Sequence, residues 1–285
     1  MTDNDTSFAG RYGPWALVAG ASEGVGAAYA RAMAERGLNV ILLARRQAAL
    51  DDLASSIRAA IGVQTRTVAV DLTEPDAMTR IVDATSGLDV GMLMYCAGAD
   101  PDYQPFLENR MEAALAMVQL NCIMPMRLCH HFAQPMVQRG QGGIALLSSG
   151  AGLAGARNVV AYGASKAAEI ALAEGLWAEL HDEGVDVLTL VLGVTDTPAL
   201  RRILAQRGML SSPDDTTAIP GASTPEEVVA DALAHLTNGP TWLVGERLRE
   251  GSQKLRSLTR SDAVKAMLQM TEGNVMNTRV GSPRT

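Results

Sequence analysis

The sequence predicts an α/β fold, a doubly wound parallel sheet of about seven strands with helices on both faces. Short apolar runs alternate with longer segments of helical spacing along most of the 285 residues. The runs are apolar at successive positions rather than at every second one, which is typical of parallel strands buried on both faces. Such strands are joined by helical crossovers, which are expected to be right-handed.

In the first half of the chain, nearly every apolar run leads into a segment of helical spacing. Strands are expected at Trp15–Ala19, Val40–Ala44, Arg66–Val70 and Val90–Tyr95. Helices are expected at Gly24–Arg36, Gln47–Ile61 and Pro75–Thr85. Gly37 and Gly62 end the first two helices, because glycine readily adopts the left-handed conformation that follows a helix.

In the second half of the chain the expected helices are longer. Helices are expected at Leu107–Val137, Ala161–Asp182 and Pro225–Leu236, and strands at Ile144–Ser148, Val185–Leu192 and Thr241–Val244. Gly184 ends the second of these helices, and Thr224 before Pro225 marks the start of the third.

The elements fit a single domain over residues 13–245, with an N-terminal arm over residues 1–12. Within it, residues 197–223 combine an amphipathic stretch with a turn-rich one, and we expect them to form a mobile lid. The lid's apolar side chains face either the core or a ligand. A C-terminal extension over residues 246–285 is expected to be helical. Its helical patterns are Glu246–Leu258 and Ser261–Met270.

Composition argues against several kinds of partner. A net charge of -7 and 4% aromatic residues disfavour nucleic acids and anionic membrane surfaces. No run of about 18 apolar residues is present, so no membrane span is expected. The three cysteines form no C-x-x-C pair, and the neighbouring His130 and His131 point different ways, so no metal site is expected. Without an apolar export signal, the chain is predicted to be cytoplasmic.

The first expected strand runs into a glycine-rich loop. Its residues are Gly20, Ala21, Ser22, Glu23, Gly24, Val25 and Gly26. Glycines at these positions allow a tight turn and a close backbone approach to a pyrophosphate, and the helix that follows offers free N–H groups to phosphates. A strand, loop and helix in this order predict a Rossmann-type sheet that binds a dinucleotide.

Residues after the second and third strands bear on the choice of cofactor. A carboxylate after the second strand would bind the ribose hydroxyls of NAD, whereas this chain has Arg45 and Arg46. Guanidinium groups suit a ribose 2′-phosphate, to which Ser22 can add a hydroxyl, so NADP(H) is predicted. The alternative is that both arginines are solvated surface charges. Asp71, followed by Leu72, lies where an adenine would bind, or is simply a turn residue.

A phenol and an ammonium group lie on one face of the expected helix Ala161–Asp182. Tyr162 and Lys166 are four residues apart, and the ammonium favours the phenolate, which suits the tyrosine to proton exchange with an alcohol or ketone. Ser149, at the end of a strand, can orient the reacting oxygen at the carboxyl edge of the sheet.

These motifs together resemble the short-chain dehydrogenase/reductase family over about residues 13–245. The matching positions are Gly20, Gly24, Gly26, Asp71, Asn121, Ser149, Tyr162, Lys166 and the run Gly193 to Thr197. The resemblance implies that Tyr162 is the general acid/base and that Lys166 supports it and binds the nicotinamide ribose. It also implies that Ser149 holds the substrate oxygen and that Asn121 anchors a water of a proton relay.

One feature of the sequence supports the role of Asn121 separately. Pro125 has no N–H to donate to the Asn121 carbonyl, which is then free to bind a water, unless the helix is merely kinked there. The resemblance also places Ala97 and Gly98 beside the adenosine ribose. Gly193, Thr195 and Thr197 would lie beside the nicotinamide.

The chain also departs from the family pattern. Ala19 replaces a threonine, Tyr95 and Cys96 replace two asparagines, and Leu192 replaces a proline. The two missing asparagines remove side-chain hydrogen bonds that would connect strands, whereas Asn121, Ser149, Tyr162 and Lys166 are all present.

Several stretches resemble bacterial NADP-dependent hydroxysteroid dehydrogenases of the 7β type. These are residues 11–15, 21–26 and 192–198 and the extended C-terminal tail. This resemblance does not identify the substrate. Because the lid and the tail together would form a large apolar cleft, hydride transfer between NADP(H) and a bulky apolar secondary alcohol or ketone is predicted. The alternatives are a ketoacyl or fatty-acyl reductase of the same fold and a non-catalytic NADP-sensing protein. A homodimer or homotetramer is expected, because the two longest helices are apolar and family members bury them against a second copy.

Overall fold

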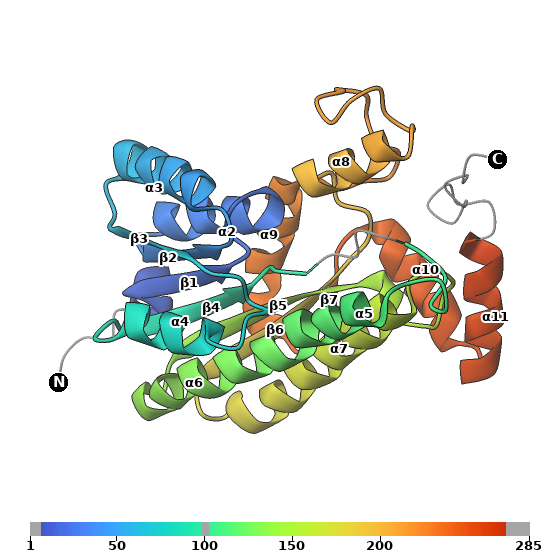
Figure 1. Ribbon diagram of the computed structural model, residues 1–285. Helices are drawn as coiled ribbons and strands as arrows, with labels where there is room; N and C mark the ends of the chain where they lie inside the picture. The colour runs from blue at the N-terminus through green and yellow to red at the C-terminus, as the bar shows by residue number, and fades with distance from the viewer. Residues whose placement is uncertain (1–6, 99–102, 272–285) are drawn as a thin grey trace.

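The computed structural model describes residues 7–98 and 103–271. Its centre is a seven-stranded parallel sheet in the order β3-β2-β1-β4-β5-β6-β7 (Figure 1). The strands are β1 Trp15–Ala19, β2 Asn39–Ala44, β3 Thr65–Ala69, β4 Val90–Tyr95, β5 Gly142–Ser149, β6 Val185–Leu192 and β7 Thr241–Leu243. Because the chain runs outward both ways from the β1–β4 pair, the carboxyl ends of these strands form a switch point where such sheets bind ligands. The Rossmann-type fold class is confirmed.

Helices cover both faces of the sheet. The larger ones are α2 Gly24–Glu35, α3 Gln47–Ile61, α4 Ala77–Thr85, α5 Met111–Val118, α6 Met124–Arg139, α7 Val160–Leu180 and α9 Pro225–His235. Helices α2, α3 and α9 lie on one face, and α4, α6 and α7 lie on the other (Figure 1). The remaining helices are α1 Phe8–Tyr12, α8 Pro198–Gln206, α10 Glu246–Arg256 and α11 Arg260–Thr271.

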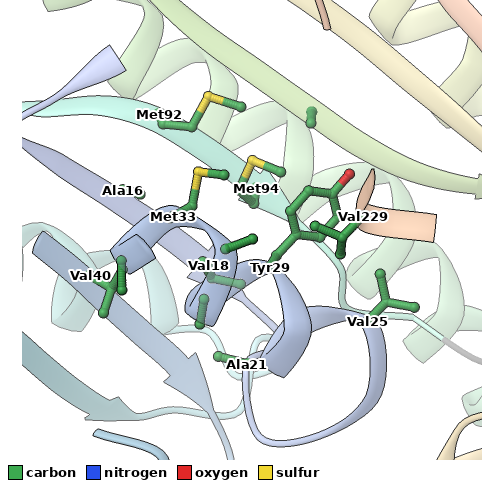
Figure 2. Close-up of a cluster of buried hydrophobic side chains, with 14 of the residues drawn as sticks. Ala16, Val18, Ala21, Val25, Tyr29, Met33, Val40, Met92, Met94 and Val229 are labelled. Carbon is green, nitrogen blue, oxygen red and sulfur yellow. The ribbon is translucent and has the colours of Figure 1, made fainter. Parts of the chain in front are cut away.

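Two apolar clusters, one on each face, account for the continuous apolar strands. In β1, Ala16 and Val18 belong to the cluster under α2, and Leu17 and Ala19 belong to the cluster under α6. Figure 2 shows Tyr29 of α2 in the first cluster, beside the strands of the sheet. The central strands β1, β2 and β4 are buried on both sides and hold few polar residues, whereas the edge strand β3 is only partly buried and carries Thr65, Arg66 and Thr67.

The expected single helix over 107–137 is wrong. The chain forms turns up to Asn109, then α5, a π-helical turn over Gln119–Ile123, and α6. Across this turn the Met124 N–H bonds to the Gln119 carbonyl, five residues earlier. Pro125 explains the irregularity, because it has no N–H for the carbonyl four residues before it.

Smaller differences lie at the ends of elements. Strand β3 begins and ends one residue earlier than expected, and α4 begins at Ala77 rather than Pro75, after a turn in which the Ala77 N–H bonds to the Glu74 carbonyl. The N-terminal arm contains the unexpected helix α1, capped by the Ser7 side chain. Parts of the arm and of the extension, residues 1–6 and 272–285, lie outside the described residues, and the division into arm, domain and extension stays a prediction.

No helix within residues 7–98 and 103–271 is long and apolar enough to cross a membrane. In the same residues, no group of three His, Cys, Asp or Glu side chains is placed to hold a metal ion.

Candidate active site

The junction of β5 and α7 fixes Lys166. The Lys166 side chain is 3% exposed, and its Nζ donates to the Leu147 carbonyl at 2.8 Å and to Glu169 Oε2 at 2.8 Å. The Ser148 hydroxyl donates to the Lys166 carbonyl at 2.7 Å, which ties α7 to the end of the strand. Lys166 is thus held by bonds at both its backbone and its side chain.

Tyr162 lies one helical turn before Lys166 and is partly exposed. The Lys166 Nζ is 5.8 Å from the centre of the Tyr162 ring, so the predicted shared helix face is confirmed. Burial acts to lower the pKa of Lys166, but the negative charge of Glu169 and the neighbouring Tyr162 outweigh burial and raise it. Lys166 is therefore an ammonium group near the phenol at neutral pH.

Ser149 is the last residue of β5 and is half-buried. Its Oγ accepts a hydrogen bond from the Ala151 N–H at 3.2 Å, at the start of the short 3₁₀ turn Gly150–Gly152. This bond uses an acceptor site of the hydroxyl and leaves its proton for donation to another oxygen.

Asn121 is fully buried in the π-helical turn. Its Nδ2 donates to Ser165 Oγ at 2.9 Å, and that hydroxyl donates to the Tyr162 carbonyl at 2.8 Å. Its Oδ1 has no hydrogen-bond partner among the described residues. The irregularity that Pro125 signals is a π-helical turn, and the role of Asn121 in a proton relay stays a prediction.

The glycine loop leaves a cradle that side chains would fill. A Cβ at Gly20, where φ is +85°, would lie 2.8 Å from the Ala97 nitrogen, and a Cβ at Gly24 would lie 3.1 Å from a Thr197 methyl carbon. A Cβ at Gly193 would meet nothing within 4 Å. Helix α2 starts after Glu23 with no side chain bonded to its first N–H groups. These residues fit a dinucleotide, whose pyrophosphate would lie at the start of α2.

The Glu23 carboxylate joins two arginines from distant parts of the chain. Arg46 Nη2 is 2.6 Å from Glu23 Oε2 and 3.2 Å from Ser22 Oγ, and Arg202 of α8 also pairs with Glu23. Burial acts to raise the pKa of Glu23, but hydrogen bonds from Arg202 and Arg46 hold it below its usual value. Arg46 is therefore not a free surface charge. Arg45 is exposed and forms no hydrogen bond or ion pair with the residues that the structure describes.

Asp71 forms the turn that the sequence left open as an alternative. Its Oδ1 accepts from the Thr73 N–H at 2.9 Å and from the Thr73 hydroxyl at 2.7 Å. Burial acts to raise the pKa of Asp71, while these bonds and Arg45 lower it overall. Leu72 beside it is 5% exposed and belongs to the core. Contact of either residue with an adenine stays a prediction.

The expected lid is tied to the site at its base. The Thr197 hydroxyl caps α8 by accepting from the Leu200 N–H at 3.2 Å, and Thr195 pairs with Ser223 in an isolated bridge. Arg201 of α8 binds both carboxylate oxygens of Asp196, at 2.6 and 2.5 Å. The ion pair of Arg202 with Glu23 then connects α8 to the glycine loop.

The C-terminal helices border the same site. Leu248 of α10 reaches within 3.1 Å of a Cβ built on Gly150, next to Ser149. The Arg260 Nη1 at the start of α11 donates to the Leu153 carbonyl at 3.1 Å. The extension therefore lies along the segment that connects Ser149 to Tyr162.

Sequence reasoning missed two side chains of the site. Glu169 follows Lys166 by three residues, so the helical spacing of a carboxylate after a lysine was a usable signal. Arg202 is 179 residues from Glu23 in the sequence, and no local pattern predicts that the two side chains pair.

The family model described as short chain dehydrogenase matches residues 14–208. A 7β-hydroxysteroid dehydrogenase of Clostridium sardiniense is 32% identical and covers 93% of this chain and 98% of its own. That of Collinsella aerofaciens is 32% identical over 84% of this chain and 89% of its own. A very-long-chain 3-oxoacyl-CoA reductase of Macaca fascicularis is 30% identical over 66% of this chain and 61% of its own.

Solved structures give a similar result. A 7β-hydroxysteroid dehydrogenase structure superposes with a TM-score of 0.82 and 29% identity, over 92% of this chain and 99% of its own. A short-chain dehydrogenase from Sphingobium yanoikuyae in complex with NADPH has a TM-score of 0.73 and 27% identity, over 95% of this chain and 99% of its own. A bulky-bulky ketone specific alcohol dehydrogenase from Comamonas testosteroni has a TM-score of 0.69 and 28% identity, over 87% of this chain and 95% of its own.

Proposed function

Since the chain belongs to the short-chain dehydrogenase family, whose members act on hydroxyl and keto groups, we propose that it reversibly transfers hydride between NADP(H) and a bulky apolar secondary alcohol or ketone. The observation that carries this proposal is the placement of Tyr162, Lys166, Ser149 and Asn121 at one end of β5, next to the glycine cradle. The named activities of the 7β-hydroxysteroid dehydrogenases support a steroid-sized substrate.

In the proposed reaction each side chain of the site has a separate role. When bound, the nicotinamide cofactor supplies or accepts the hydride. In ketone reduction, Tyr162 donates its phenolic proton to the carbonyl oxygen, and Ser149 donates a hydrogen bond to the same oxygen. The Lys166 ammonium stabilises the phenolate that remains. Asn121, with its buried unpaired Oδ1, anchors a water through which the proton is replaced.

For the cofactor, Arg45→Asp is expected to weaken NADPH binding and to improve NADH binding. A ribose 2′-phosphate would lose a charge-assisted hydrogen bond of about 1.5–3 kcal/mol and would meet a carboxylate. We choose Arg45 first because Arg46 is already paired with Glu23. Fluorescence titration of both cofactors gives the ratio of their Kd values.

Arg58→Asp serves as the control, because it makes the same charge change near the far end of α3, where Arg58 bonds to Ser55 and Thr65. It is expected to leave the ratio of Kd values unchanged. If Arg45→Asp also leaves the ratio unchanged, Arg45 does not bind the phosphate, and Arg46 becomes the residue to test.

For the substrate, a bulky apolar ketone such as a 7-oxosteroid is expected to be turned over with a kcat/KM at least about tenfold above that of acetoacetate. Each buried methylene group contributes about 0.8 kcal/mol, so even a few apolar contacts produce this preference. Apolar side chains are available to such a ligand: Val194, just before the lid segment, is 50% exposed, and Met209, within it, is 37% exposed. NADPH oxidation measured with both ketones tests the preference, and equal values would contradict it.

A 3-oxoacyl-CoA reductase is the second candidate, because a relative of that name is 30% identical to this chain. Its substrate carries a long acyl chain and several phosphates. A kcat/KM for a 3-oxoacyl-CoA above that for every steroid ketone would favour it. A non-catalytic NADP-sensing protein is disfavoured, since the chain has lost none of the four residues proposed for the reaction.

We also propose that a second copy of the chain covers α5. Along α5, the π-helical turn and α6, exposed apolar side chains recur every three to five residues, so they line one face. They are Met111, Leu115, Val118, Ile123 and Met126. Burying this stripe in an isologous contact gives a homodimer, or a homotetramer if a second contact forms. Light scattering is expected to give at least twice the chain mass of 30.0 kDa, and Leu115→Glu is expected to reduce it.

A further inference from the structure

A buried carboxylate lies beside the lysine of the site. Glu169 is on α7, one turn after Lys166, and its side chain is 0% exposed. Its Oε2 accepts from Lys166 Nζ at 2.8 Å, and its Oε1 has no hydrogen-bond partner within residues 7–98 and 103–271. Replacing a buried ion pair by apolar side chains often leaves a protein as stable or more so, so stability alone gives a weak reason for a glutamate here.

Lys166 is the one cation facing this carboxylate in the part of the chain that the structure describes. The other titratable groups that interact with Glu169 come from the end of β4, the π-helical turn and α6. They are Tyr95, Cys96, Cys122 and Cys129. All four are neutral when protonated, so none of them offsets the negative charge. Burial raises the pKa of Glu169 to about 7, against the opposing effect of Lys166.

Lys166 in turn depends on Glu169 to keep its positive charge. Lys166 is buried almost completely, and burial favours the neutral amine. The Leu147 carbonyl accepts a hydrogen bond from Nζ but carries no full charge. Without a counter-ion, the buried lysine would lose its proton at a lower pH, and a neutral amine cannot stabilise a phenolate at Tyr162.

We propose that Glu169 is a positioning residue of the reaction, which keeps Lys166 charged inside the fold and holds its Nζ at the end of β5 facing Tyr162. This rests on the proposed hydride transfer, because it assigns Glu169 to the support of that site. Its effect passes entirely through Lys166.

The first test needs neither cofactor nor substrate. The chain has three lysines, Lys166, Lys254 and Lys265, so protein labelled with ¹³C at lysine Cε gives few NMR signals, and the loss of one in Lys166→Met assigns Lys166. In the wild type, the Lys166 signal is expected to titrate above the ordinary lysine value of about 10.4. In Glu169→Gln its midpoint is expected at least about one pH unit below that of the wild type.

Two variants sharpen this comparison. Glu169→Asp keeps the charge and is expected to restore most of the wild-type midpoint. Glu179→Gln removes an exposed carboxylate from the same helix and is expected to change nothing. A Lys166 midpoint in Glu169→Gln equal to that of the wild type would overturn the proposal, even if no substrate of the enzyme had been found.

The second test uses turnover of a 7β-hydroxysteroid with NADP⁺. In Glu169→Gln, kcat is expected to fall as the pH rises through the midpoint measured by NMR, because Lys166 then loses its charge. The wild type is expected to keep its rate there, and KM is expected to stay within about threefold. A rate that holds through that midpoint would show that the reaction does not use this charge, and would overturn the assignment.

If Glu169→Gln does not fold, a double-mutant cycle read by Tm decides instead. At a pH well above 7, the Glu169 carboxylate in a Lys166→Met background is an unpaired buried charge, so adding Glu169→Gln is expected to raise Tm there. A lower Tm in that background would mean that Glu169 supports the fold independently of Lys166, and the proposal would fail.

Discussion

Tyr162→Phe is expected to bind NADPH with the affinity of the wild type and to lose turnover by about 10²–10⁴-fold, the usual contribution of a general acid/base. The phenyl ring fills the same space, so the site keeps its shape. The neighbouring bonds of α7, from Ser165 Oγ to the Tyr162 carbonyl and from Lys166 to Glu169, do not involve the lost hydroxyl. What disappears is the proton that the ketone oxygen receives.

The measurement is single-turnover oxidation of NADPH by a ketone that the wild type reduces, with NADPH affinity measured separately by fluorescence. Tyr103→Phe is the matched control, because it removes a phenolic hydroxyl that the mechanism does not use. A Tyr162→Phe variant that retained more than about a tenth of wild-type turnover would reject Tyr162 as the general acid/base.

Local signals in the sequence were enough to predict most of the fold, and they pointed to Ser149, Tyr162 and Lys166 as side chains of the candidate site, whose roles stay predictions. Parallel strands buried on both faces give continuous apolar runs, and the glycine loop carries its own spacing. Tyr162 and Lys166 share a helix face because they are four residues apart, and that spacing survives folding. Ser149 could be placed because it ends a strand, and the carboxyl ends of parallel strands meet at one edge.

Features that depend on contacts between distant segments could not be predicted in the same way. The pairing of Glu23 with Arg202 joins the glycine loop to α8, and neither residue has a neighbour in the sequence that signals it. The π-helical turn was signalled by Pro125, but the sequence does not tell whether the helix kinks or reorganises its hydrogen bonds. The geometry settles this, because the Met124 N–H bonds five residues back and Asn121 turns into the core.

A second large effect is expected from Gly98→Ala, which should lower turnover by about 10²-fold or more. Gly98 has a φ of +122°, which L side chains rarely adopt, so alanine costs about 1–3 kcal/mol of backbone strain. Its Cβ would also overlap Asn121 Oδ1 and lie 3.2 Å from Lys166 Nζ. One methyl group would therefore displace the Asn121 amide and shift Lys166 Nζ slightly. A misplacement of about 1 Å at a reacting site costs about 10²-fold in rate.

Gly87→Ala separates this displacement from backbone strain. Gly87 has a φ of +74°, but a Cβ there would meet nothing within 4 Å, so alanine adds strain without touching the site. Both variants are expected to lower Tm by a few degrees, since 1 kcal/mol shifts Tm by about 2–4 °C in a chain of this size. Only Gly98→Ala is expected to lose turnover, as NADPH oxidation would show. Equal turnover in the two variants would mean that Asn121 and Lys166 can shift without loss of rate. That result would contradict roles that require both side chains to be held in place.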